Sequence, residues 1–255
     1  MIVQQRVRDM RVAAPLLAKT TPLLSKIRRV LPMSQAGAED RFLQCLSLIV
    51  TGWLHQGNVE LFDYCFANLP SGAPVIEVGS FAGLSLNTII HLLRRHGRSN
   101  PVFSVDDWNF FPKDTGRIGD STISYEEFRS FLIETFTRNV SLFSRGDLPH
   151  HIVSNSDRFF ADWAAGNSKT DLFSREVVLG GRISFAYIDG DHSYEQSLKD
   201  FQNVDRHLEV GGFVVFDDSM DTREFPCWRT AREATERSDC RVVDKRPCYC
   251  VQKIA

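Results

Sequence analysis

Short apolar runs that alternate with helical segments constrain the fold of this 255-residue chain more than any other feature. Beyond the break at Pro70-Ser71-Gly72, we expect each run to form a strand and each amphipathic segment to form a helix. The expected strands are Pro74–Val78, Val102–Val105, His151–Val153, Ile183–Ile188 and Phe213–Phe216. The expected helices are Leu84–Arg95, Tyr125–Asn139, Asp157–Ala164, Tyr194–His207 and Trp228–Arg237. Alternation of this kind is typical of an α/β fold with a mostly parallel sheet.

Both ends of the chain add elements to this alternation. Arg241–Lys245 and Tyr249–Gln252 predict a closing antiparallel hairpin around Arg246-Pro247, which brings the sheet to seven strands. Upstream, apolar residues at helical spacing predict two helices. The first stripe is Phe42, Cys45, Leu46, Ile49, Val50 and Trp53, and the second is Val59, Leu61, Phe62, Cys65, Phe66 and Leu69. We therefore expect an N-terminal helical extension or arm over residues 1–70 and one domain over residues 71–255.

Composition excludes several classes of protein. With 43% hydrophobic residues the chain can bury a core without disulfides, and its six cysteines lack paired CxxC spacing, so a reduced, cytoplasmic protein is expected. A net charge of -2 gives no argument for a nucleic-acid partner. No apolar run approaches the length of a transmembrane segment. The basic N-terminus, residues 1–33, is either a packing extension or an arm that contacts a membrane or a partner subunit.

The first motif with chemical content is a glycine turn between the first expected strand and its helix. The sequence EVGSFAG runs from Glu77 to Gly83. Gly79 permits a tight turn with close backbone approach, and Gly83 permits tight entry into the helix. Exposed amides at such a turn suit an anionic or polar ligand, such as the carboxylate end of an amino acid. Many strand-to-helix turns use glycine, so this motif alone leaves the function open.

Polar residues also follow the second and third expected strands. Asp106 is the preferred acceptor for the two hydroxyls of a ribose, and Asp107 is the alternative. Farther along, Ser156 or Asp157 could contact the edge of an adenine or could cap the following helix. The glycine turn lacks the full GxGxxG pattern, which argues against a nicotinamide or flavin cofactor.

The most specific signal is a pair of strands that each end in acidic residues. The sequence IDGDHS contains Asp189, Asp191 and His192, and the sequence VVFDDS contains Asp217 and Asp218. Ligands of an open parallel sheet bind beyond the carboxyl ends of its strands, so these side chains share a crevice if the strands are neighbours. Carboxylates this close repel one another unless a cation neutralises them. Oxygen ligands select magnesium, calcium or manganese over zinc.

A metal ion in this crevice could hold two substrate oxygens and lower the pKa of the one that reacts. His192, with an ordinary pKa near neutrality, is then within reach to remove the proton. Each acid also has a local alternative: a turn at Asp189-Gly190, a helix cap at Asp191, or a helix cap at Asp217-Asp218-Ser219. Two acidic clusters that end two apolar strands favour the metal site.

These stretches resemble class I methyltransferases of the macrocin O-methyltransferase type, a group that includes metal-dependent sugar O-methyltransferases of antibiotic biosynthesis. The matching sequences, which cover about Val75 to Ser219, are IEVGSFAGLS, SVDDW, IDGDHSYEQSLKDF and L-x-x-GG-x-VVFDDS from Leu208. The pair IDGDHSY and GG-x-VVFDDS is fairly specific to this group, whereas most class I methyltransferases share the glycine turn. The resemblance implies a Rossmann-like class I methyltransferase fold.

The resemblance also implies cofactors and roles. It implies S-adenosylmethionine (SAM) near the glycine turn and a site for Mg²⁺, or another divalent cation, formed by Asp189, Asp217 and Asp218. It implies His192 as the catalytic base, with Asp191 as the alternative because members of the family differ in this residue. The residues expected to contact SAM are Glu77, Gly79, Ser80, Gly83, Asp106, Ser156 and Asp189.

The expected reaction is methyl transfer from SAM to a hydroxyl of a small acceptor, such as a sugar, a glycoside or a catechol-like compound of natural product biosynthesis. Two alternatives stay open: a metal-independent N- or O-methyltransferase, and a non-catalytic SAM-binding module. The long segment Asn109–Ser124 is a candidate substrate lid, and many enzymes of this group form homo-oligomers.

Overall fold

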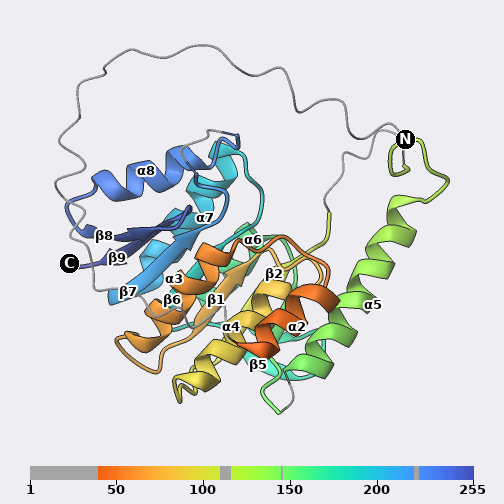
Figure 1. The fold of residues 1–255 in the computed structure, drawn as a ribbon, viewed down its shortest axis with the longest axis horizontal. Helices are drawn as coiled ribbons and strands as arrows, with labels where there is room; N and C mark the ends of the chain where they lie inside the picture. Colours follow the sequence, from red (N-terminus) through yellow and green to blue (C-terminus); the bar gives the residue numbers. More distant parts are fainter. Residues whose placement is uncertain (1–39, 110–115, 145, 221–223) are drawn as a thin grey trace.

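The protein is an open twisted sheet with helices on both faces (Figure 1). The computed structural model describes residues 40–109, 116–144, 146–220 and 224–255. The basic N-terminus and part of the candidate lid lie outside these residues. The seven-stranded sheet has the order β3-β2-β1-β6-β7-β9-β8, and β9 runs antiparallel to both of its neighbours. This arrangement confirms the expected mostly parallel sheet with a closing antiparallel hairpin.

Most elements agree with the expected ones within a few residues. The strands of the large sheet are β1 (Val75–Val78), β2 (Val102–Asp106), β3 (His150–Val153), β6 (Ile183–Ile188), β7 (Leu208–Phe216), β8 (Cys240–Lys245) and β9 (Tyr249–Lys253). The helices are α2 (Arg41–Ile49), α3 (Gln56–Ala67), α4 (Leu84–Arg95), α5 (Tyr125–Phe143), α6 (Ser156–Ala165), α7 (Tyr194–His207) and α8 (Trp228–Glu236). Sequence analysis missed the small antiparallel pair β4 (Ser168–Thr170) and β5 (Glu176–Val178), whose three-residue strands carry too short a pattern.

Two hydrophobic cores lie on opposite faces of the sheet. One core contains residues of α2, α3, α4 and α5, and the other contains residues of α6, α7 and α8. Along β1, Val75 packs into the first core while Ile76 and Val78 pack into the second. Strands buried on both faces read as continuous apolar runs, which explains why the sequence pattern located them so well.

The upstream helices are part of the first core. Phe62 and Phe66 of α3 pack edge-on against Phe185 of β6, and Phe62 also packs against Tyr187. One expectation for α2 is wrong, because the helix ends at Ile49 and Trp53 lies in the linker to α3 with 84% of its surface exposed. The boundary at residue 70 stays a prediction.

The order of the strands places a ligand site at one point of the sheet. From β1 the chain builds outward through β2 to β3, and it then returns to place β6 on the other side of β1. The crevice outside the carboxyl ends of strands at such a reversal is where ligands of open α/β sheets bind. No described helix is both long and apolar enough to cross a membrane.

Candidate active site

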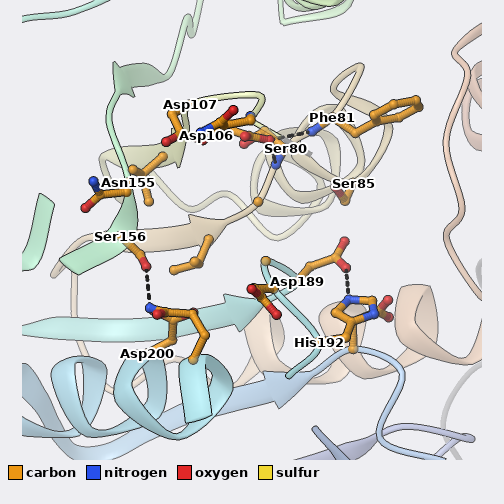
Figure 2. Close-up of a pocket in the computed structure, with 18 of the residues that line it drawn as sticks. Ser80, Phe81, Ser85, Asp106, Asp107, Asn155, Ser156, Asp189, His192 and Asp200 are labelled. Atoms are coloured by element: carbon orange, nitrogen blue, oxygen red, sulfur yellow. Dashed lines mark hydrogen bonds and ion pairs between the residues drawn. The ribbon is translucent and has the colours of Figure 1, made fainter. Parts of the chain in front are cut away.

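A cleft of about 1060 Å³ opens at the carboxyl ends of the parallel strands. Gly79, Asp106, Ser154, Asp189 and Asp217 line it, and each follows or ends a different strand of the sheet. Figure 2 shows two ends of this cleft. The labelled residues at one end are Asp106, Asp107, Asn155 and Ser156, and those toward the other end are Phe81, Ser85, Asp189 and His192.

The glycine turn brings the backbone of β1 against the end of β6. Gly79 has a φ of +84°, and a Cβ atom there would lie 2.0 Å from the carbonyl oxygen of Asp189. Gly83 caps α4 with a φ of +88° and offers no side-chain acceptor to the first N–H groups of the helix. Because the first N–H groups of a helix lack intrahelical partners, the start of α4 suits an anionic group of a ligand.

Replacing Gly79 by alanine is expected to destabilise the protein more than an equivalent change at Gly97. Both glycines have positive φ values, so each substitution costs roughly 1–2 kcal/mol of backbone strain. No described atom lies within 4 Å of the Cβ position at Gly97, whereas at Gly79 the strand ends must separate. Urea unfolding of Gly79→Ala and Gly97→Ala measures the difference. Equal losses of unfolding free energy would show that the close contact with Asp189 relaxes without cost.

Asp106, the last residue of the neighbouring strand β2, stabilises the glycine turn through hydrogen bonds. Its Oδ2 accepts the backbone N–H groups of Ser80 at 2.8 Å and Phe81 at 3.1 Å, and its Oδ1 accepts that of Trp108 at 2.7 Å. Burial raises the pKa of Asp106 despite these three hydrogen bonds. The amides of Ser80 and Phe81 are therefore already engaged, which corrects the expectation that the turn amides are exposed. Lone pairs remain on both oxygens for a ribose, and Asp107 lines the same end of the cleft.

Glu77 is buried under the turn without a well-formed partner. Its side chain is fully buried, and neither carboxylate oxygen has a hydrogen-bond partner among the described residues. Burial raises the pKa of Glu77 to about 8, although the nearby hydroxyls of Ser85 and Ser80 oppose the shift. The hydroxyls of Ser80 and Ser154 are buried at this cleft and are likewise unpartnered within the described part of the chain. Buried polar groups without partners are uncommon in folded proteins, so this cluster marks the turn as a candidate ligand site.

The end of the cleft that contains Asn155 and Ser156 has an additional buried acid, Asp200. Asn155 is the N-cap of α6, so the alternative role of Ser156 and Asp157 as helix caps is wrong. The hydroxyl of Ser156 accepts a hydrogen bond from Gln196 Nε2 at 3.2 Å, and Gln196 also donates to Asp200. Burial raises the pKa of Asp200 to about 6. Sequence analysis missed Gln196 and Asp200, whose spacing of four residues places both on one face of α7.

The acidic end brings together three of the residues that the sequence singled out. Ligand atoms of Asp189, His192 and Asp217 all lie within 4.8 Å of one another. Nε2 of His192 lies 3.5 Å from Asp189 Oδ1, and Nδ1 lies 3.1 Å from Asp218 Oδ2. Asp218 therefore contacts the ring nitrogen of His192 opposite to the one that faces Asp189.

The electrostatics of this end are those of crowded, buried acids. Burial and the neighbouring Asp217 carboxylate raise the pKa of Asp189 well above its usual range. Burial also raises the pKa of Asp217. Burial alone would lower the pKa of His192, but hydrogen bonds to Asp189 and Asp218 outweigh it and raise the pKa to about 10. The expectation of an ordinary, near-neutral pKa for His192 is therefore wrong in the ligand-free protein.

Asp191 lies at the rim of the cleft rather than in this cluster. Its side chain is exposed, and Oδ1 accepts the backbone N–H of Ser193 at 2.7 Å. Ser193 is the N-cap of α7 and Cys227 that of α8, so the alternative cap roles of Asp191 and Asp217 are wrong. Phe225 packs edge-on against the ring of His192, with centroids 5.0 Å apart. The catalytic and metal-binding roles of these residues stay predictions.

The upstream segment also reaches the site, at positions that no sequence motif indicated. Asn58 of α3 is fully buried, and its Nδ2 donates a hydrogen bond to Asp217 Oδ1 at 2.6 Å. Trp53 lines the cleft and lies against Phe81, with ring centroids 5.4 Å apart. The site therefore depends on packing of the upstream helices onto the sheet.

Together, the strand order, the antiparallel β9 and a cleft between a glycine turn and the acids after β6 and β7 define the class I methyltransferase fold. The chain belongs to the methyltransferase domain family, whose model matches residues 76–219. Asn58 and Trp53 lie outside this matched segment.

Solved structures of methyltransferases share this fold at low sequence identity. The O-methyltransferase TomG from Streptomyces achromogenes, which is involved in tomaymycin synthesis and was solved with SAM, is 12% identical. The alignment covers 85% of this chain and 91% of TomG, with a TM-score of 0.52. The O-methyltransferase NovP is 22% identical over 78% of this chain and 80% of its own, with a TM-score of 0.50. These likenesses show the fold.

Another solved structure shares this fold, and one curated relative matches a short segment of the chain. The O-methyltransferase from Bacillus cereus in complex with SAH is 9% identical over 91% of this chain and 100% of its own, with a TM-score of 0.50. An uncharacterized protein of Acanthamoeba polyphaga mimivirus is 41% identical over 49 residues, or 19% of this chain. The aligned stretch spans 22% of that relative's length.

Proposed function

We propose that the protein transfers a methyl group from SAM to a hydroxyl of a small-molecule acceptor, assisted by a divalent cation. The observation that carries this proposal is the convergence of Asp189, His192 and Asp217 in the same cleft as the glycine turn. TomG and the Bacillus cereus enzyme, which share the fold, are O-methyltransferases with SAM or SAH bound. Both are in line with SAM as the methyl donor.

The residues of the cleft fit SAM in charge and polarity. Glu77, buried and unpartnered within the described chain, would accept the ammonium group of the methionine portion. The uncapped start of α4 at Gly83 suits its carboxylate, and Gly79 with Ser80 shapes the turn around it. Asp106 or Asp107 would hold the ribose. We place the adenine near Ser156, at the nucleoside end of the cleft.

The donor set of the acidic end fits a divalent cation. Two carboxylates and an imidazole suit Mn²⁺ at least as well as Mg²⁺, because imidazole is a better ligand for transition metals. Asp189, Asp217 and His192 would hold the cation; Asp218 would orient His192 or, as first expected, act as a ligand. When bound, the cation would lower the pKa of an acceptor hydroxyl.

The reaction requires the protein to align the acceptor oxygen with the methyl carbon and to remove one proton. The acceptor oxygen forms a bond to the methyl carbon as the bond from that carbon to sulfur breaks, and the electron pair stays on sulfur to give SAH. If Asp218 is the third ligand, as first expected, His192 is free to act as the proposed base; if His192 itself holds the cation, Asp191 at the rim is the base. The walls formed by Trp53 and Phe225 would hold the acceptor in line with sulfur.

One observation favours a metal-independent methyltransferase as the second candidate. His192 lies between Asp189 and Asp218, and its raised pKa of about 10 means that an imidazolium already neutralises part of the acidic cluster. In this case the acids would orient the acceptor without a cation.

Removal of metal separates these two candidates. We expect isothermal titration to show SAM binding to the EDTA-treated protein and a separate binding signal for Mg²⁺. We also expect methyl transfer to a panel of sugars, glycosides and catechols to fall at least tenfold after EDTA treatment and to return with Mg²⁺ or Mn²⁺, because a metal-activated hydroxyl is worth several kcal/mol. Undiminished turnover in EDTA would support the metal-independent enzyme. SAM binding without turnover would support a binding module, and a folded protein that fails to bind SAM would contradict the proposal.

A further inference from the structure

Asn58 joins the upstream helix α3 to the acidic end of the cleft. Its side chain is 0% exposed, and Nδ2 lies 2.6 Å from Oδ1 of Asp217. A hydrogen bond between a neutral donor and a carboxylate is shorter and stronger than one between neutral groups. Asn58 precedes the family-matched segment 76–219, so the family core alone does not supply this contact.

The hydrogen bonds that orient the amide of Asn58 are those that its Nδ2 donates. Besides Asp217, Nδ2 faces the hydroxyl of Tyr187 at 3.4 Å. The amide oxygen Oδ1 is buried and has no partner among the described residues. The reversed amide would direct its oxygen at a carboxylate oxygen, where two acceptors oppose each other. The unpartnered Oδ1 of Asn58 costs stability, because a buried acceptor without a hydrogen bond is unfavourable. The short hydrogen bond from Nδ2 to Asp217 is the interaction that offsets this cost and explains an asparagine at this position.

Packing holds α3 in place independently of this hydrogen bond. A Cβ atom at Gly57 would lie 1.6 Å from the carbonyl oxygen of Arg246, so the start of α3 touches the backbone of the closing hairpin. Arg246 Nη1 also lies 2.8 Å from Glu60 Oε2. The ring of Phe62 packs edge-on against Tyr187 with centroids 4.8 Å apart. Packing of α3 therefore sets the position of the Asn58 amide, independently of its hydrogen bond to Asp217.

We infer that Asn58 is a positioning residue that holds the carboxylate of Asp217 in the orientation that binds the cation together with Asp189 and His192. This inference rests on the proposed function, because it concerns the same metal site. It makes α3 a part of the active site: a chain that lacked this helix would retain the acids and the weak, long contact of Cys248 Sγ with Asp217 Oδ1 at 3.9 Å, but it would lose the short amide donor at 2.6 Å. Groups that hydrogen-bond to metal ligands typically change metal affinity by 10–100-fold when they are removed.

The test is the affinity of the full chain for Mn²⁺, measured from the electron paramagnetic resonance signal of the free ion. Asn58→Leu keeps the number and branching of the side-chain heavy atoms and removes the donor, and we expect its Mn²⁺ affinity to fall at least tenfold. SAM affinity, measured by titration, is expected to stay within threefold. Glu60→Gln is the matched control, because it weakens the contact between α3 and Arg246 and leaves the donor on Asn58 in place. We expect this control to bind Mn²⁺ as the wild type does.

A second measurement follows the response to metal in the wild-type chain and uses a variant only to assign the signal. With ¹⁵N-labelled asparagine, the side-chain amide signal of Asn58 is expected to shift when Mg²⁺ is added. Asn100 is the internal control, because its Nδ2 donates to the carbonyl oxygens of Ser71 and Ala73, away from the cleft. The signal that disappears in Asn58→Asp identifies Asn58.

The outcomes separate this inference from the proposed function. A folded Asn58→Leu protein with wild-type Mn²⁺ affinity, or an Asn58 amide that does not respond to Mg²⁺, would overturn the role of Asn58 and leave the metal site standing. A comparable loss of affinity in Glu60→Gln would also overturn it, by showing that general loosening of α3 is enough. A wild-type chain that binds SAM but no metal would overturn both the metal site and this inference.

Discussion

Replacing Asp217 by asparagine is expected to lower methyl transfer by about three orders of magnitude while SAM affinity stays within a few-fold. Asp217 is nearly buried, and its carboxylate lies close to Asp189 and His192 in the acidic cluster of the cleft. An asparagine keeps the shape but removes the charge that would hold a cation. Loss of several kcal/mol of transition-state stabilisation corresponds to roughly a thousandfold in rate. Steady-state turnover and titration with SAM measure the two effects.

A hairpin acid supplies the control for this substitution. Asp244→Asn also removes one carboxylate, from an ion pair with Arg246 at 2.7 Å outside the cleft, and we expect it to leave turnover within twofold. Asp189→Ala should behave as Asp217→Asn does. A large loss of SAM affinity in both site variants would argue against a metal site that is separate from the cofactor site.

The parts of the fold that sequence analysis placed well are those with strong local signals. The bounds of β6, α4 and α7 agree with the expected ones residue for residue. Strand β6 is buried on both faces and therefore reads as one apolar run, Ile183–Ile188. Helix α7 begins at a serine N-cap, Ser193, whose side chain accepts the backbone N–H of Gln196. Such local rules act over a few residues and need no knowledge of tertiary contacts.

The parts that sequence analysis missed depend on contacts between distant segments. Asn58 reaches Asp217 across 159 residues of sequence, and no spacing within α3 indicates that contact. Helical spacing around residue 50 assigned Trp53 to the buried stripe, but the helix ends first and leaves the ring at the cleft. Strand β7 begins at Leu208, before Gly211 and Gly212, which interrupt the apolar pattern and hid its start. Tertiary packing overrides local pattern at each of these positions.

The charge states in the site also lie beyond the sequence. An isolated histidine titrates near neutrality, and the motif IDGDHS does not say which acids will face it. In the folded protein the ring of His192 contacts Asp189 on one nitrogen and Asp218 on the other, which raises its pKa to about 10. Asp106 is a second example. The sequence predicts that it contacts a ligand, but not that its carboxylate accepts hydrogen bonds from three backbone N–H groups. The identity of a site residue is easier to predict from the sequence than its protonation state.

The second large effect is expected for Glu77→Gln, which should stabilise the ligand-free protein at alkaline pH while it weakens SAM binding. The pKa of Glu77 is raised from 4.5 to about 8, so the folded state holds a proton that the unfolded chain releases. Stability from this group is complete below pH 4.5 and is lost as pH rises through 8. At 1.36 kcal/mol per pKa unit, the loss amounts to at most about 5 kcal/mol. Glutamine lacks this titration, so the difference in unfolding free energy between variant and wild type should grow across that pH range.

Bound SAM is expected to lower the pKa of Glu77, whereas burial raises it. This opposite shift provides the most direct test of the prediction. A bound ammonium group favours the charged carboxylate, so SAM binding at pH 7 should release a proton from wild-type protein and none from Glu77→Gln. Titrations in buffers of different ionisation enthalpy measure that proton, and SAM affinity of the variant should fall roughly 10- to 100-fold, the worth of one charged hydrogen bond. Asp200→Asn is the matched control, because the pKa of Asp200 is raised only to about 6 and its stability change falls in a lower pH window. Proton release that persists in Glu77→Gln would show that another acid of the cleft receives the ammonium group. In that case Glu77 would be a buried, neutral carboxylic acid that supports the turn, and its pKa would reflect burial alone.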